Sequence, residues 1–219
     1  MIIRQLGRVD YQQTWEAMRA FTDARTPETE DELWVCEHAP VFTQGVAGKP
    51  EHLLFNPTNI PVITTDRGGQ ITYHGPGQVV AYTLFDLRRP KLGVREFVRR
   101  LESAIIDVLA ADGIVAYGKV DAPGVYVRRT VHGTDAAIGL ESKIAALGLK
   151  VRNGCTYHGV AVNVDMDLGP FTAIDPCGYA GLAVTQMREL GSTRDVAAVG
   201  DALAARLCKW LNARPNVNG

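Results

Sequence analysis

Residues 61–84 read PVITTDRGGQITYHGPGQVVAYTL, and this stretch decides the fold. Pro61–Thr65, Gln70–Tyr73 and Gln78–Leu84 are runs rich in apolar and β-branched residues, a composition typical of β-strands. The glycines between these runs, together with Pro76, predict turns that separate one strand from the next. We therefore expect a group of consecutive strands at the centre of the chain.

Helices flank this group of strands. Residues 11–20 predict a short N-terminal helix, and the apolar residues of 94–108 recur at three- and four-residue spacing with arginines between them. A C-terminal helix follows Ser192 or Thr193, either of which can cap it, and its apolar stripe runs to Leu211. Because the strands come in groups and the helices are few, we expect an α+β fold. The other predicted strands are Leu33–Val35, Val41–Phe42, Gly124–Val127, Lys143–Val151 and Gly159–Val164.

The composition excludes several classes of protein. Of the 219 residues, 46% are hydrophobic and 21% are charged, which is typical of a globular protein and predicts a single domain over residues 1–219. The net charge of −1 argues against nucleic acid as a partner. Because the sequence shows neither an apolar run long enough to span a membrane nor a signal-peptide pattern, we expect a cytoplasmic protein with no membrane partner.

Residues 67–78 hold the densest concentration of chemically useful side chains. Four glycines in eleven positions accompany arginine, threonine, tyrosine, histidine and glutamine. Glycine lets a backbone approach a ligand closely and present its N–H groups. The glycines alone favour a β-hairpin with two tight turns. Arg67, His74 and Gln78 favour a ligand pocket instead, with Thr72 and His74 on one face of a strand. The spacing is not that of a phosphate-binding or dinucleotide-binding loop.

Four cysteines are candidates for core residues, metal ligands or nucleophiles. Cys177 lies in Asp-Pro-Cys-Gly-Tyr, where proline and glycine favour a turn, and an exposed turn thiol suits a nucleophile. Cys36 and Cys208 lie in apolar segments, which favours core packing. The Cys-x-His that begins at Cys36 and the Cys-x-x-His that begins at Cys155 each supply half of a zinc site at most, so we expect no metal.

Lys143 opens an apolar, strand-like segment. Two interpretations are open. The side chain either extends from a strand end to water, or is held in an apolar site where burial lowers its pKa and makes it a base near neutral pH. The residues alone favour neither.

Taken together, these places make the sequence resemble the octanoyl-[acyl-carrier-protein]–protein octanoyltransferases of lipoate synthesis. The resemblance lies in four motifs in the family's order, and it extends in weaker form over nearly the whole chain. The motifs are RGGQITYHGPGQVVAY (67–82), KIAALGLKV (143–151), CTYHGVAVNVDMDL (155–168) and DPCGYAGLAVTQ (175–186).

The resemblance implies an α+β domain in which helices flank a mixed β-sheet, as in the biotin and lipoate protein ligases. It also implies that Cys177 is the acyl-thioester nucleophile and that Lys143 is its partner, which lowers the pKa of the thiol. No cofactor or metal is expected, because a thioester is already activated. The residues implied to line an acyl pocket are Arg67, Gly68, Gly69, Gln70, Ile71, Thr72, Tyr73, His74, Ala146, Leu147, Gly148, Gly159, Val160 and Ala161.

The implied reaction moves an octanoyl group from octanoyl-acyl carrier protein to a lysine of a lipoyl domain, the first step of endogenous protein lipoylation. The implied acceptors are the lipoyl domains of 2-oxoacid dehydrogenase complexes and the glycine cleavage H protein, and we expect a monomer. One departure is the stretch Arg128–Glu141, which looks longer than the short hairpin that the family often has. A basic run from Arg88 to Arg100 is either a solvated helix face or a docking surface for the acidic carrier protein.

Three other functions are open on the residues. An ATP-dependent lipoate or biotin ligase has the same fold but makes an acyl-adenylate and needs no nucleophilic cysteine. A non-catalytic acyl-binding protein forms no covalent species on Cys177. A generic cysteine hydrolase fits less well, because no Cys/His/Asn pattern of the papain kind is evident.

Overall fold

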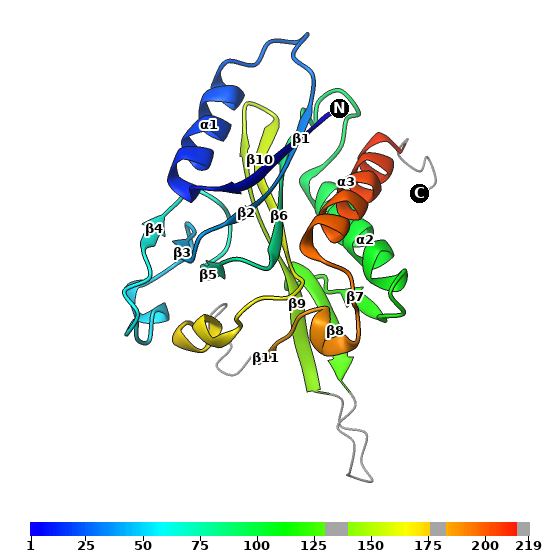
Figure 1. Ribbon diagram of the computed structural model, residues 1–219. Coiled ribbons are helices and arrows are strands. Elements are labelled where there is room, and N and C mark those ends of the chain that lie inside the picture. Colours follow the sequence, from blue (N-terminus) through cyan, green and yellow to red (C-terminus); the bar gives the residue numbers. More distant parts are fainter. Residues whose placement is uncertain (130–139, 176–182, 214–219) are drawn as a thin grey trace.

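The computed structural model describes residues 1–129, 140–175 and 183–213, and its centre is a large mixed sheet (Figure 1). The strands of this sheet are β1 (Ile2–Val9), β2 (Glu32–His38), β6 (Gln78–Leu84), β7 (Ala116–Gly118), β8 (Gly124–Arg129), β9 (Leu140–Arg152), β10 (Cys155–Asn163) and β11 (Ala183–Val184). They follow the order β1-β2-β6-β10-β9-β8-β7, with β11 beside β9. The β1–β2 and β9–β11 pairs are parallel, whereas the other neighbours are antiparallel.

Helices cover both faces of this sheet, and the predicted α+β fold is confirmed. α1 (Tyr11–Asp23) lies on one face, and α2 (Val94–Ala110) and α3 (Val196–Asn212) pack together on the other (Figure 1). In the described part of the chain, no helix combines the length and the apolar character that crossing a membrane requires. Short 3-10 helices are η1 (Pro50–His52), η2 (Gly169–Ala173) and η3 (Arg188–Leu190).

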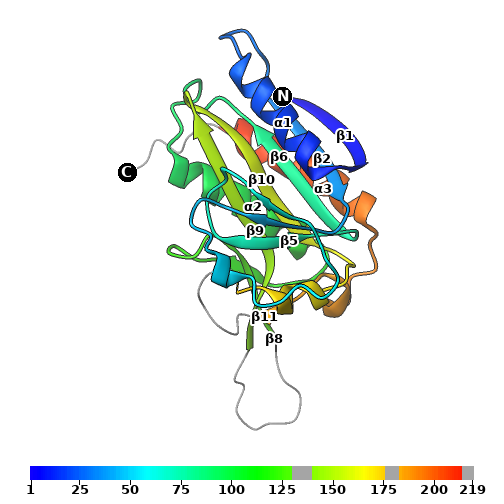
Figure 2. The same cartoon turned by 90° about the vertical axis from the view of Figure 1, so that its left-hand side faces the viewer.

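A second, smaller sheet lies over the face that α1 covers (Figure 2). It has the order β4-β3-β5 and is formed by β3 (Val41–Gln44), β4 (Val62–Thr64) and β5 (Ile71–His74). The predicted strands of residues 61–84 are thus confirmed, but they divide between two sheets: β4 and β5 join the small sheet, whereas β6 lies in the centre of the large one.

The largest apolar cluster lies between the large sheet and the helices α2 and α3. Phe97, Leu101 and Ile105 from α2 are fully buried in it, so the predicted stripe of that helix is confirmed. Two charged residues share this buried face. Arg100 donates hydrogen bonds to the carbonyl oxygens of Trp210 (3.2 Å) and Ala213 (2.7 Å), and so satisfies acceptors at the end of α3. The other is Glu102, which is 7% exposed.

Three expectations need correction. The predicted strands do not include Ile2–Val9, which pairs with β2 along the sheet edge and leaves most of its side chains exposed. The N-cap of α3 is neither Ser192 nor Thr193 but Asp195, whose carboxylate accepts the N–H of Ala198 at 2.8 Å. Arg100 does not belong to an exposed basic surface, because its side chain is buried.

Candidate active site

A cavity of about 440 Å³ lies between the large sheet and the segment of residues 67–74. With one exception, the residues expected to line an acyl pocket line this cavity. The exception is Tyr73, whose ring instead packs against Phe42 and Phe171, with ring centroids 5.6 and 5.5 Å away. On β5, Thr72 and His74 share the strand face opposite that of Tyr73, and both line the cavity.

The floor of the cavity is formed by small residues of β9 and β10. Ala146 pairs with Ala161 and Gly148 pairs with Gly159 across the two strands, so the four lie side by side on one face of the sheet. A Cβ atom at Gly148 would lie 3.0 Å from the carbonyl oxygen of Gly68. These small residues let the segment of residues 67–70 approach the sheet while space remains beside it.

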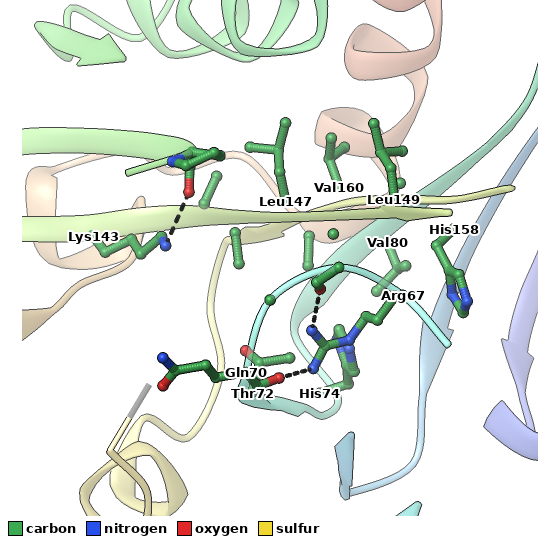
Figure 3. A pocket seen from close by; sticks show the side chains of 18 of the residues that line it. Arg67, Gln70, Thr72, His74, Val80, Lys143, Leu147, Leu149, His158 and Val160 are labelled. Carbon is green, nitrogen blue, oxygen red and sulfur yellow. Dashed lines mark hydrogen bonds between the residues drawn. The ribbon is translucent and has the colours of Figure 1, made fainter. Parts of the chain in front are cut away.

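Arg67 holds that segment in shape rather than reaching to solvent. Its guanidinium is buried and donates to the hydroxyl of Thr43 (3.1 Å from Nε) and to the carbonyl oxygens of Gly68 (2.9 Å) and Gln70 (2.8 Å) (Figure 3). The N–H of Gly68 in turn donates to the carbonyl oxygen of Leu149 at 2.8 Å. The glycine-rich segment is therefore attached both to β3 and to the free edge of β9.

His74 is a neutral member of a buried polar chain. Its Nδ1 lies 2.7 Å from Oε1 of Gln78, and Nε2 of Gln78 donates to Oδ1 of Asn163 at 2.9 Å. Because the Gln78 oxygen can only accept, Nδ1 carries the proton. Burial, reinforced by the charges of other basic groups, lowers the pKa of His74 to about 3. His74 can thus shape the cavity but is a poor general base at neutral pH.

The inner end of the cavity is lined by polar rings, including those of Tyr11, Tyr82 and His158. Nε2 of His158 lies 3.0 Å from Oδ1 of Asp66. Burial lowers the pKa of His158 despite this carboxylate, so the contact is a hydrogen bond from a neutral imidazole rather than an ion pair. Nδ1 of His158 and the hydroxyl of Tyr11 have no hydrogen-bond partner among the described residues.

Asp66 orders this end from outside the cavity. Besides His158, its carboxylate accepts hydrogen bonds from Nε1 of Trp15 (2.9 Å) and from the hydroxyl of Tyr157. Burial works against the charged form, but the three hydrogen bonds outweigh it and hold the pKa of Asp66 well below its usual value. The charged carboxylate of Asp66 therefore fixes the orientation of the His158 ring, which lines the cavity.

Lys143 lies at the opposite end of the cavity from His158 (Figure 3). Lys143 is half-buried as a residue, and its ammonium donates to the carbonyl oxygen of Pro123 at 3.2 Å and lies 5.4 Å from the centre of the Tyr126 ring. The register of β8 and β9 shifts between Val125 and Tyr126, next to the strand partner of Lys143. Lys143 fits neither simple interpretation from the sequence, because it is held by specific contacts at the mouth of an apolar cavity.

Of the described thiols, those of Cys36 and Cys155 are buried and that of Cys208 is half-buried, and all three are protonated. Burial raises the pKa of Cys36 to about 12 and also raises the pKa values of Cys155 and Cys208. Core packing is confirmed for Cys36. Cys177 lies outside the described residues, as does most of the stretch Arg128–Glu141. Over the described ranges, no group of three or more His, Cys, Asp or Glu side chains is placed to hold a metal ion.

Comparison with known proteins shows the family to which the chain belongs. Residues 10–208 match the family model described as the lipoyl protein ligase A/B catalytic domain. The chain belongs to this family. An octanoyltransferase of Chromobacterium violaceum is 61% identical over 96% of this chain and 96% of its own, and one of Aeromonas hydrophila is 58% identical over 96% and 88%. Identity at this level over nearly full length makes the protein an acyltransferase.

Solved structures of the family and its neighbours share the fold. Lipoate-protein ligase A bound with ATP superimposes with a TM-score of 0.74 at 16% identity, covering 96% of this chain and 85% of that one. Biotin protein ligase from Aquifex aeolicus, in complex with biotin and ATP, does so with a TM-score of 0.58 at 12% identity, covering 96% and 70%. At such identities the likeness shows the fold alone, and the expected relation to both ligase folds is confirmed.

The sequence does not predict several residues that line the cavity or lie near Lys143, namely Tyr11, Glu102, Gly124 and Tyr126. It singles out His158 only as half of a zinc pair. For Glu102 a signal exists: it lies four residues after Val98 and three before Ile105, inside the apolar stripe of the helix. For Tyr11 and Tyr126 no local signal is available, because both are aromatic residues of ordinary amphipathic elements.

Proposed function

We propose that this acyltransferase moves an octanoyl group from octanoyl-acyl carrier protein to a lysine of a lipoyl domain, through a thioester on Cys177. The observation that carries the proposal is the cavity: an apolar channel between Lys143 and His158 with a floor of alanine and glycine, which suits an unbranched acyl chain. Burial of each CH₂ contributes about 0.8 kcal/mol, so such a channel can select chain length. The names of the relatives supply the octanoyl group.

The proposed chemistry needs two half-reactions. The thiol of Cys177 gives its proton to the neutral amine form of Lys143, and the thiolate attacks the octanoyl carbonyl carbon. A carbon–sulfur bond forms to Cys177, the bond to the phosphopantetheine sulfur breaks, and Lys143 returns the proton to that leaving thiolate. The neutral lysine amine of the lipoyl domain then attacks the new thioester, and the bond to the Cys177 sulfur breaks. Lys143 takes the excess proton of the amine and passes it to the leaving Cys177 thiolate, so the products are an amide and the free thiol. No cofactor or metal is required, because the thioester donor is already activated.

The proposal also covers the acceptor proteins, the oligomeric state and the cellular compartment. Lipoyl domains of 2-oxoacid dehydrogenase complexes and the glycine cleavage H protein are the acceptors. A similar structure comes from an archaeal lipoylation system described as a bipartite lipoate protein ligase and its E2 lipoyl domain from Thermoplasma acidophilum. We place residues 1–219 in one catalytic domain that acts as a monomer in the cytoplasm, where thiols stay reduced. The net charge of −1 supports neither nucleic acid nor a membrane surface as a partner.

An assay of lipoyl-domain octanoylation distinguishes this function from that of the ATP-dependent ligases with the same fold. We expect product from octanoyl-acyl carrier protein without ATP, and none from free octanoate even with ATP and Mg²⁺. Product from octanoate that depends on ATP would show that the protein is a ligase. The absence of product under both conditions, with octanoate retained by the protein, would show a non-catalytic acyl-binding protein.

A further inference from the structure

We propose that Glu102 is a positioning residue for Lys143: it holds the backbone on which the lysine side chain lies, and its carboxylate balances the ammonium charge. This inference rests on the proposed function, because it takes Lys143 as the group that moves protons during acyl transfer. Glu102 is on α2, and neither the motifs nor the cavity lining includes it.

The first observation is the burial of Glu102. The side chain is 7% exposed and shares the apolar face of α2 with Leu101 and Ile105. A carboxylate in such surroundings is destabilising unless hydrogen bonds and an opposite charge compensate it. We therefore expect the Glu102 carboxylate to have a hydrogen-bond donor and a positive charge nearby, and its contacts show which groups these are.

The second observation is the contact between Glu102 and the start of β8. Oε1 accepts the backbone N–H of Gly124 at 3.0 Å. A Cβ atom at Gly124 would lie 2.4 Å from Cε and 3.0 Å from Nζ of Lys143, so the lysine side chain lies directly across this glycine. The preceding residue, Pro123, offers the carbonyl oxygen that accepts the Lys143 ammonium at 3.2 Å. One hydrogen bond thus fixes the backbone unit that holds the lysine.

The third observation is the room made for the carboxylate on its other side. A Cβ atom at Gly118, on β7, would lie 2.8 Å from Oε2 of Glu102. Gly124 has a φ of +146°, a value that side-chain-bearing residues rarely adopt. The carboxylate is therefore enclosed between Gly118 of β7 and Gly124 of β8. Because Gly124 has no side chain, it also leaves room for the side chain of Lys143.

Electrostatics couple the two side chains. Burial raises the pKa of Glu102, whereas the hydrogen bond from Gly124 and the charge of Lys143 lower it. Such coupling is reciprocal, so a carboxylate here favours the ammonium form of Lys143. Other charged or titratable groups lie near the Lys143 ammonium. Asp121 lines the cavity, and the ammonium lies over the ring of Tyr126. Lys119 lies 4.9 Å from the centre of the same ring and pairs with Glu141 at 2.7 Å. Glu102 lies on α2 and reaches the region of the Lys143 ammonium from that helix.

The test uses Glu102→Gln in the full-length enzyme, because glutamine keeps an acceptor for the Gly124 N–H and removes the charge. We expect the NMR titration midpoint of the Lys143 ε-carbon to lie about one pH unit lower in the variant. The resonance is assigned by its absence from Lys143→Arg. Glu32→Gln is the matched control, a buried acid on β2 that pairs with Arg4, and its Lys143 titration should equal that of the wild type. An unchanged midpoint in Glu102→Gln would overturn the proposal.

Acylation kinetics give an independent readout. In single turnovers with octanoyl-acyl carrier protein, we expect the alkaline limb of the Glu102→Gln rate profile to shift to lower pH in parallel with the NMR midpoint, with the substrate KM unchanged. A loss of rate that is uniform across pH would make Glu102 merely structural. If the wild-type enzyme forms no thioester, the proposed function fails, whereas the NMR comparison still tests Glu102.

A second variant covers the case in which Glu102→Gln does not fold. Glu102→Asp keeps the charge but shortens the reach to Gly124. We expect a Lys143 titration near that of the wild type together with slower acylation, because the charge remains while the backbone contact is lost. A wild-type rate would show that the contact with Gly124 does not position the lysine.

Discussion

At the scale of single residues, the two ends of the cavity perform different tasks. His158 and Tyr11 give the inner end polar atoms without a charge, whereas Lys143 provides the outer end with an ammonium that can release a proton. The carbonyl oxygen of Pro123 and the ring of Tyr126 contact that ammonium, and a permanently charged guanidinium could make the same two kinds of contact. Proton transfer is what distinguishes lysine from other cations at this position.

Substitution of Lys143 tests that difference. We expect Lys143→Ala to lower octanoyl transfer by about 10²–10⁴-fold, the usual contribution of a positioned acid–base group. Lys143→Arg should restore little, since a guanidinium does not release a proton in a protein. Steady-state turnover with a lipoyl-domain acceptor is the measurement. Wild-type turnover by the arginine variant would eliminate Lys143 as a base.

At the scale of elements, the cavity depends on the pairing of β9 with β10, which brings Ala146, Gly148, Gly159 and Ala161 together. We expect Gly148→Val to reduce transfer of octanoyl much more than transfer of butanoyl from the same carrier. The added side chain meets Gly68 and Arg67 and fills the path of the longer chain. The ratio of kcat/KM values for the two acyl groups is the measurement. Equal losses for both groups would instead indicate a damaged fold.

The start of α2 is the element that suits a carrier protein. Arg95 and Arg99 are exposed and lie one turn apart, and Val94 and Val98 beside them line the cavity. Arg99 also pairs with Glu96 at 2.9 Å. We expect replacement of both arginines by glutamate to raise the KM for octanoyl-acyl carrier protein and to flatten its salt dependence.

The matched substrate for this prediction is a small octanoyl thioester that lacks the carrier. Its turnover should hardly change, because it does not use the basic surface. Equal losses with both substrates would mean that the double substitution disturbs α2 itself. Unchanged kinetics with the carrier would place its docking surface on another element.

The sequence predicts elements and motif residues better than it predicts their neighbours. Periodicity identifies the stripe of α2. The resemblance of residues 67–74 to the family motif predicts cavity-lining residues, and the prediction is wrong only for Tyr73. The sequence does not identify the role proposed for Glu102, because that role depends on the approach of Gly124 from a strand more than twenty positions later. The strand at Ile2–Val9 is missed for a similar reason, since pairing at a sheet edge rather than an apolar pattern forms it.

At the scale of the whole molecule, buried neutral histidines link stability to pH. Burial lowers the pKa values of His38, His74 and His158, that of His74 to about 3, whereas an unfolded histidine titrates near about 6.5. Between these values the unfolded chain binds protons that the folded chain does not. The stabilisation is therefore complete above the unfolded pKa and decreases as pH falls toward the folded values.

From pH 7 to pH 5, His74 alone predicts a decrease of about 2 kcal/mol in the free energy of unfolding. His38 and His158 act in the same direction. Asp66 does not contribute in this window, because its lowered pKa matters only below the usual aspartate range. Urea unfolding at the two pH values is the measurement. A free energy that stays constant or rises toward pH 5 would mean that these histidines are charged in the folded protein.

The most direct test of the account is intact-protein mass spectrometry after mixing with octanoyl-acyl carrier protein in the absence of acceptor. We predict one added octanoyl group per chain, mapped to Cys177, released by hydroxylamine, and absent from Cys177→Ser. Cys155→Ser is the control, because Cys155 is buried and its pKa is raised, and this variant should carry the group as the wild type does. An adduct that maps to another residue or persists in Cys177→Ser would contradict the account.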